Sequence, residues 1–310
     1  MKKLAVKLLC MLLALALTLA AWVGVIAAVP DRMQGTIAAT MHTKVDLLQS
    51  TQGQGNRILF AGGSSSPYGT VCQTVADATG YTALDVGATA YLGLAYYLNL
   101  LDQYAQAGDV VVLAPEHMML AAACVDYKLV WQAAGNDLDV WATVPLDYLP
   151  GLLSNSDDYF AMRWDTRHNE LETYHGQFGP LGDVTAYRTP LLESGWNTQD
   201  PVYLRPGGWS QENVDAINRF AETMEQRGVQ VYFAFAPLDQ AAVQTTAEEV
   251  DAYAASLTDA LAVPVILTQQ QAILPAGYFY DSNNHLTSEG ADLYTADLIA
   301  GLQAQGMGAA

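Results

Sequence analysis

Positively charged side chains are scarce in this chain of 310 residues. Thirteen Lys and Arg residues stand against 32 Asp and Glu residues, and the formal net charge at pH 7 is −19. This excess of negative charge opposes binding to nucleic acids and to anionic membrane surfaces. We therefore expect no nucleic-acid partner.

Cysteine is also scarce, with three residues in the whole chain. Cys10 does not form a lipoprotein signal, because the bulky Leu9 precedes it where such signals have a small residue. Cys72 and Cys124 either pair in an oxidising compartment or remain buried free thiols. The sequence leaves these two alternatives open.

Charge is absent from Leu8 to Pro30, and Lys2, Lys3 and Lys7 come before this apolar run. A membrane-spanning helix needs about 20 apolar residues, whereas the apolar part of a signal peptide has about 7–15. The length predicts an uncleaved membrane anchor over residues 1–30, with a cleaved signal segment as the alternative. The lysines place the N-terminus in the cytoplasm. We thus expect a single-pass cell-membrane protein with an extracytoplasmic C-terminal domain, or alternatively a secreted protein.

Residues 31–56 are polar, which predicts a linker, and the folded domain is expected over residues 57–310. Strand-like and helix-like segments alternate from Arg57 onward, which is typical of an α/β domain with a mainly parallel sheet. We expect strands at residues 57–62, 82–88, 109–115, 230–237 and 263–268. The expected helices cover residues 90–108, 210–228, 248–262 and 287–305, the first ending at Gly108 and the second and last capped by Ser210 and Thr287.

The segment at about residues 143–209 interrupts this alternation. It contains Trp164, Trp196 and Trp209 together with many Tyr, Gly and Pro residues. A segment of this length predicts an insertion or a lid over the sheet.

Small residues follow the first expected strand in the sequence GGSSSPYG, residues 62–69. Ligands of open α/β sheets bind beyond the carboxyl ends of the strands, so Ser64 is a candidate nucleophile and Ser65 a reserve candidate. The alternative interpretation is a turn that caps a helix. Gly87 follows the second expected strand, where an unobstructed backbone N–H is suited to bind an oxyanion.

A polar loop with the sequence YFYDSNNHLTSEG, residues 278–290, precedes the last expected helix. Its His285 is a candidate general base, and Asp281 is a candidate carboxylate that orients the imidazole. The alternative is a surface loop with a helix-capping Thr. The turn at residues 62–69, here called the serine turn, and this loop, here called the histidine loop, are expected to meet at the same edge of the sheet. Their proximity favours a joint role.

A second polar segment contains His168 and His175 on either side of Glu170 and Glu172. Their spacing matches no common set of metal ligands, so we interpret them as a solvated face and expect no metal or other cofactor.

The serine turn and the Asp281–His285 loop resemble the first and last sequence blocks of the SGNH/GDSL hydrolases. Residues 84–118 resemble the membrane-anchored bacterial branch of that superfamily, which is related to proteins acting on acyl groups of cell-envelope polymers. The resemblance implies a three-layer α/β/α, flavodoxin-like domain. It also implies that Ser64 is the nucleophile, His285 the base and Asp281 its orienting acid, with the backbone N–H groups of Ser64 and Gly87 forming the oxyanion hole.

Two features depart from the pattern of these hydrolases. The acid and base are spaced as DxxxH instead of DxxH. The Asn of the third sequence block has no counterpart, because Pro115, Glu116 and His117 follow the third expected strand.

The resemblance implies an extracytoplasmic serine esterase or O-acyltransferase that acts on acyl esters, expected to be acetyl esters, of a cell-envelope carbohydrate. Membrane anchoring suits such a substrate and a membrane-embedded acyl-donor protein as partner. The alternative is a catalytically inactive binding or assembly module for envelope polysaccharide modification, which the two departures favour. A phosphate-binding role for the serine turn is disfavoured by the negative net charge and by the lack of nearby cations other than Arg57.

Overall fold

The computed structural model describes residues 2–169, 177–191 and 200–308. Its main feature is a five-stranded sheet with the strand order β2-β1-β3-β4-β6. All four neighbouring pairs are parallel. The strands are β1 (Arg57–Gly62), β2 (Thr82–Asp85), β3 (Val110–Ala114), β4 (Gln230–Ala234) and β6 (Val265–Leu267). The predicted α/β class and all five predicted strands are therefore confirmed.

A second, two-stranded parallel sheet pairs β5 (Leu238–Asp239) with β7 (Ile273–Leu274). The longer helices after the first strand are α4 (Cys72–Thr79), α5 (Leu94–Tyr104), α11 (Gln211–Gln226), α12 (Ala247–Ala260) and α14 (Ser288–Ala304). Shorter elements at the carboxyl edge of the sheet are α3 (Ser65–Gly69), η2 (Ala90–Leu92), α6 (His117–Ala121), α13 (Gln269–Ala272) and η5 (Ala276–Tyr278).

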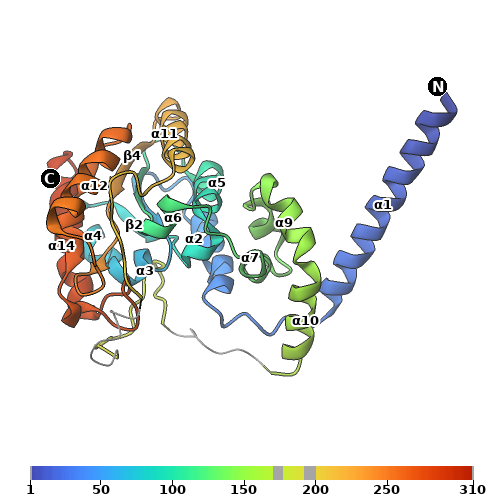
Figure 1. The fold of residues 1–310 in the computed structure, drawn as a ribbon, viewed down its shortest axis with the longest axis horizontal. Helices are drawn as coiled ribbons and strands as arrows, with labels where there is room; N and C mark the ends of the chain where they lie inside the picture. Colours follow the sequence, from blue (N-terminus) through green and yellow to red (C-terminus); the bar gives the residue numbers. More distant parts are fainter. Residues whose placement is uncertain (1, 170–176, 192–199, 309–310) are drawn as a thin grey trace.

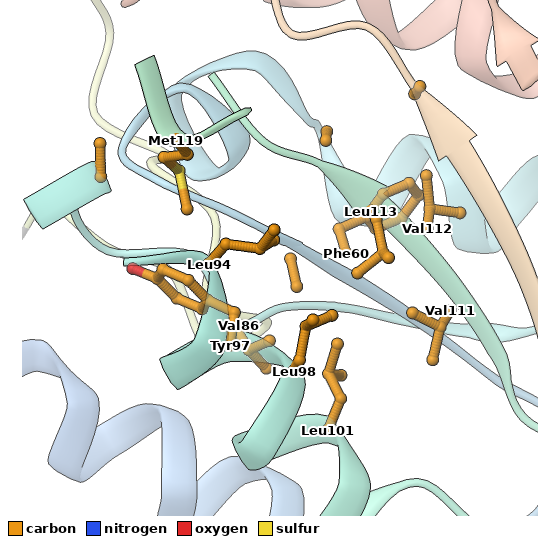
Figure 2. Packing of buried hydrophobic residues seen from close by; sticks show 14 of the residues in the cluster. Phe60, Val86, Leu94, Tyr97, Leu98, Leu101, Val111, Val112, Leu113 and Met119 are labelled. Atoms are coloured by element: carbon orange, nitrogen blue, oxygen red, sulfur yellow. The ribbon is translucent and has the colours of Figure 1, made fainter. Parts of the chain in front are cut away.

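Helices pack on the sheet in two groups. The helices α4 and α14 contact each other and the outer strands β2 and β6, whereas α5 and α11 contact each other and the inner strands β1 and β4. Figure 2 shows buried side chains of β1 and β3, including Phe60 and Val111, near Leu98 and Leu101 of α5. Every residue of β1 and β3 is buried, as expected for strands of a covered parallel sheet.

Helix ends agree with the sequence in part. Thr287 caps α14 as predicted, because its side chain accepts a hydrogen bond from the Gly290 N–H. Ser210 occupies the N-cap position of α11, but its side chain makes no capping hydrogen bond. The helix α5 ends at Tyr104, before the predicted end at Gly108.

The predicted linker over residues 31–56 is instead part of the fold. It contains η1 (Ala38–Thr40) and α2 (Met41–Ser50), whose Met41, Val45 and Leu48 side chains are buried in the hydrophobic core. The composition of this segment does not show the apolar face of α2, because polar residues occupy the other face of the helix. The folded unit therefore begins before Arg57.

The N-terminal helix α1 (Lys2–Ala28) is long and apolar enough to cross a membrane. It extends away from the rest of the chain, and only its last turns approach the other helices (Figure 1). There the Trp22 indole donates a hydrogen bond of 2.9 Å to Ser156 Oγ, and its ring packs on Phe160.

The segment between β3 and β4 interrupts the alternation from α6 onward, earlier than the predicted residue 143. It includes α7 (Tyr127–Ala134), α8 (Leu138–Ala142), η3 (Leu146–Tyr148), α9 (Leu149–Ser154) and α10 (Ser156–Thr166). Figure 1 shows α7, α9 and α10 between the sheet and α1. Residues 177–191 instead contact the sheet edge, where the Asp85 N–H donates to Leu181 O. Trp196 lies outside the described residues.

The three cysteines are free thiols, with Cys72 buried and Cys124 partly buried. Of the two alternatives for Cys72 and Cys124, the structure therefore supports unpaired thiols.

We expect α2 to contribute to global stability. Replacement of fully buried Leu48 by Ala should lower the free energy of unfolding by about 2–5 kcal/mol, because it leaves a cavity in the core. The matched change Leu293→Ala, at a side chain that is 44% exposed, should cost less than about 1 kcal/mol. Urea unfolding of the full chain in detergent measures both, and equally small effects would contradict a structural role for α2.

Candidate active site

The serine turn lies between β1 and α3, at the carboxyl edge of the sheet. The chain passes from β1 to β2 on one side and from β3 to β4 on the other, so the direction of the connections reverses between β1 and β3. Ligands of open α/β sheets bind at such a switch point. The register pairs Phe60 with Asp85 and Gly62 with Ala114, which brings the ends of β2 and β3 beside the turn.

Glu116 holds the serine turn from the end of β3. Its buried carboxylate accepts hydrogen bonds of 2.9 Å from the Gly63 N–H, through Oε2, and from the Ser65 N–H, through Oε1. These two amides flank Ser64. The sequence alone assigns no role to Glu116, which stands in the block where the Asn of the SGNH/GDSL pattern has no counterpart.

Asp85 holds the same turn from the end of β2. Its Oδ2 accepts a hydrogen bond of 2.6 Å from Ser66 Oγ, and its Oδ1 accepts one of 2.8 Å from the Gly87 N–H. Burial raises the pKa of Asp85 to about 7, although the nearby Lys44 ammonium and these two hydrogen bonds oppose the rise. The sequence does not identify Asp85 as a site residue either, because an Asp at the end of a strand is not by itself evidence of a functional role.

The three consecutive serines have different environments. Ser66 Oγ is bonded to Asp85, and Ser65 Oγ is buried without a hydrogen-bond partner in the described part of the chain. Ser64 is the only one of the three that is partly exposed. Neither its hydroxyl nor its N–H makes a hydrogen bond to another described residue. Accessibility therefore favours Ser64 over Ser65 as the group that a ligand can reach.

The structure joins Asp281 and His285. His285 Nδ1 lies 2.6 Å from Asp281 Oδ1, and the His285 side chain is 13% exposed. Ser282 Oγ accepts hydrogen bonds from the N–H groups of Asn284 and His285, which bends the loop so that the DxxxH spacing closes. With Nδ1 as the donor to Asp281, the lone pair of Nε2 is available to accept a proton.

Tyr68 connects the histidine loop to the serine turn. The His285 ring stacks on the Tyr68 ring with centroids 4.1 Å apart and an interplanar angle of 10°. Tyr68 belongs to α3, and its N–H donates to Ser64 O. The tertiary structure thus places His285 against the short helix that begins beside Ser64.

Arg188 stabilises this juxtaposition. It is buried, and its guanidinium donates to Leu286 O in the histidine loop and to Tyr68 O in α3. It also donates to the carbonyl oxygens of Val184 and Ala186 in its own segment. Burial lowers the pKa of Arg188, and the nearby Tyr68, Asp183 and Asp281 oppose this effect.

Two interactions that the implied roles of Ser64, His285 and Gly87 require are not formed among the described residues. The described hydrogen bonds include none between the Ser64 hydroxyl and the His285 ring. The Gly87 N–H, the predicted second oxyanion donor, is bonded to Asp85 Oδ1. Gly87 nevertheless lies against the serine turn, because a Cβ built on it would be 2.7 Å from Gly63 O and 2.9 Å from Ser66 Cβ.

The remaining sequence candidates lie away from this site or have other partners. Arg57 is buried at the amino end of β1 and pairs with Asp109 at 2.5 Å, so it does not face the serine turn. His168 is exposed, and His175, Glu170 and Glu172 lie outside the described residues. In residues 2–169, 177–191 and 200–308, no group of three or more His, Cys, Asp and Glu side chains is arranged to hold a metal ion.

Comparison of the sequence with models of known protein families finds no match, and comparison with curated proteins finds none either. The geometry of the site is therefore the basis for assigning a function. That geometry provides a partly exposed hydroxyl, an unbonded backbone N–H beside it, and an imidazole oriented by a carboxylate.

The close contact between Gly63 and Glu116 predicts that Gly63→Ala destabilises the fold. A Cβ at Gly63 would overlap both carboxylate oxygens of Glu116 and lie 2.6 Å from Ala90 N. We expect the free energy of unfolding to fall by about 1–3 kcal/mol in urea titrations. Gly277→Ala is the matched control, because a Cβ there has no atom within 4 Å; equal effects of the two changes would show that Glu116 does not restrain the turn.

Proposed function

We propose that this chain is a membrane-anchored serine esterase or O-acyltransferase of the SGNH type. Its substrate is an acyl ester, in the first instance an acetyl ester, of a cell-envelope carbohydrate. The observation that carries the proposal is the position of Ser64. Its hydroxyl and N–H have no hydrogen-bond partner among the described residues, and they lie on a turn held by two carboxylates, at the start of the helix on which His285 stacks.

In the proposed reaction, Ser64 Oγ attacks the ester carbonyl carbon while His285 Nε2 accepts the hydroxyl proton. Asp281 keeps the proton on Nδ1 and stabilises the imidazolium that forms. The intermediate then expels the alcohol, which takes the proton from His285 and leaves the acyl group on Ser64. Water releases this group as a carboxylic acid in an esterase, whereas a carbohydrate hydroxyl accepts it in a transferase.

The oxyanion of the intermediate accepts a hydrogen bond from the Ser64 N–H. Removal of one such donor typically costs a factor of about 10²–10³ in rate. Gly87 is the proposed second donor, and its N–H must exchange Asp85 Oδ1 for the oxyanion or share itself between them. The Ser64–His285 hydrogen bond forms on substrate binding, because catalytic hydrogen bonds are often long in ligand-free enzymes and tighten in the complex.

The fold and the N-terminal helix support the proposed class and location. The strand order of the main sheet matches the order 2-1-3-4-5 of flavodoxin-like proteins, and two groups of helices pack on it. We assign the arrangement to a three-layer α/β/α domain. With Lys2, Lys3 and Lys7 on the cytoplasmic side, α1 anchors the domain outside the cell, beside envelope substrates and a membrane-embedded acyl-donor protein.

A non-catalytic binding or assembly module is the second candidate. It is favoured by the missing Ser64–His285 hydrogen bond and by the use of the Gly87 N–H within the protein. Such a module would bind envelope carbohydrate without forming an acyl-enzyme.

Serine reactivity distinguishes the two candidates. We expect the full chain in detergent to react with a fluorophosphonate probe and to hydrolyse p-nitrophenyl acetate. Ser64→Ala should abolish labelling and should lower hydrolysis about a thousandfold or more, as should His285→Ala for hydrolysis. Ser65→Ala is the matched control and should keep labelling, because Ser65 Oγ is buried.

Labelling that survives Ser64→Ala would overturn the assignment of the nucleophile. Absence of labelling in a folded wild-type chain would favour the binding module.

A further inference from the structure

We propose that Asp85 is a positioning residue for the serine turn, and that Lys44 holds the Asp85 carboxylate in place. The inference rests on the proposed function, in which Ser64 is the nucleophile. Asp85 does not contact the reacting atoms. It acts through Ser66 and Gly87, which lie on the two backbone segments that carry the proposed oxyanion donors.

One carboxylate joins two segments that are far apart in sequence. The 2.6 Å bond to Ser66 Oγ holds the first turn of α3, and the 2.8 Å bond to the Gly87 N–H holds the loop after β2. Gly87 packs closely against Gly63 and Ser66. The geometry of Asp85 therefore determines how far the Ser64 N–H lies from the Gly87 N–H.

Lys44 of α2 lies beside the Asp85 carboxylate. Its Nζ is 3.9 Å from Asp85 Oδ1, donates a 2.9 Å hydrogen bond to Asp85 O, and also donates to Gly182 O. The Lys44 side chain is buried and lies over the Phe178 ring, with Nζ 4.9 Å from its centroid. Burial lowers the pKa of Lys44, and Asp85 opposes this effect.

Other ionisable groups also face the pair. Asp183 accepts a hydrogen bond from the Cys72 N–H, and both residues are buried near Lys44. Tyr294 of α14 is buried near Asp85 and Glu116. Burial raises the pKa of both carboxyl groups, Asp85 and Asp183, and the Lys44 ammonium opposes the rise in each.

Protonation of Asp85 should loosen the turn. A protonated carboxyl group gains a donor and loses acceptor capacity, so it holds the Ser66 hydroxyl and the Gly87 N–H less firmly. Since the pKa of Asp85 is raised to about 7, this change occurs near neutral pH. Above that pH the carboxylate holds both groups.

The test compares Asp85→Asn, Lys44→Met and the double variant with wild type, using the full chain in detergent and the fluorophosphonate probe. Asp292→Asn, at an exposed residue of α14, is the matched control and should label at the wild-type rate. At pH 8.5 we expect Asp85→Asn to label about tenfold more slowly than wild type, which corresponds to about 1.4 kcal/mol. At pH 5.5 the two rates should converge, because wild-type Asp85 is then protonated.

The double variant separates positioning from a merely structural ion pair. It removes both buried charges, so it should unfold in urea at a concentration closer to wild type than either single variant does. If Asp85 positions the turn, labelling by the double variant stays at least about fivefold slow at pH 8.5. Recovery of the wild-type rate, or a rate ratio that does not change with pH, would overturn the proposal.

Hydrogen exchange at pH 8 provides a readout that needs no reactive serine. In Asp85→Asn, peptides that cover residues 60–70 and 84–92 should exchange faster than in wild type, while peptides of α12 should not change. Unchanged exchange in the first two peptides would overturn the positioning role. If these peptides respond but wild type is never labelled, the proposed function fails while the role of Asp85 in holding the turn stands.

Discussion

Two buried carboxylates hold the turn after β1, and the arrangement of the candidate site depends on their hydrogen bonds. Glu116 from the end of β3 accepts the Gly63 and Ser65 N–H groups, and Asp85 from the end of β2 accepts the Ser66 hydroxyl and the Gly87 N–H. Both can reach the turn because parallel strands end at the same edge. The turn is thereby restrained on both sides of Ser64, whose hydroxyl and N–H make no hydrogen bond to another described residue.

Four of the thirteen Lys and Arg residues form internal connections. Lys44, Arg57, Arg163 and Arg188 are all buried. Each donates to backbone carbonyl groups that are distant in sequence, such as Tyr104 O for Arg57 and Val29 O for Arg163. A buried charge is costly unless it is paired and hydrogen-bonded. Lys44, Arg57 and Arg163 lie near both carboxylate and carbonyl oxygens, whereas the described acceptors of Arg188 are carbonyl oxygens.

The N-terminal region is joined to the rest of the domain by hydrogen bonds and by core packing. Val29 O accepts a hydrogen bond from Arg163, and the Trp22 indole donates to Ser156 of α10. Further along the chain, α2 contributes side chains to the core, and its Lys44 lies beside Asp85, which holds the serine turn. The helix α2, which follows the apolar helix α1 along the chain, thus contacts Asp85 through Lys44.

The sequence by itself determined the five strands of the main sheet, because a short apolar run bounded by Gly or Pro is a local signal for a strand. It also pointed to the two polar loops, and the structure brings the Asp281–His285 pair and α3 together through Tyr68. Only the tertiary structure decided that α2 is a core element, since its apolar face is short and its neighbours along the chain are polar. The contacts of Glu116 with the serine turn and of Asp85 with Ser66 likewise join residues 19 or more positions apart, which strand order and register bring together and which no local pattern records.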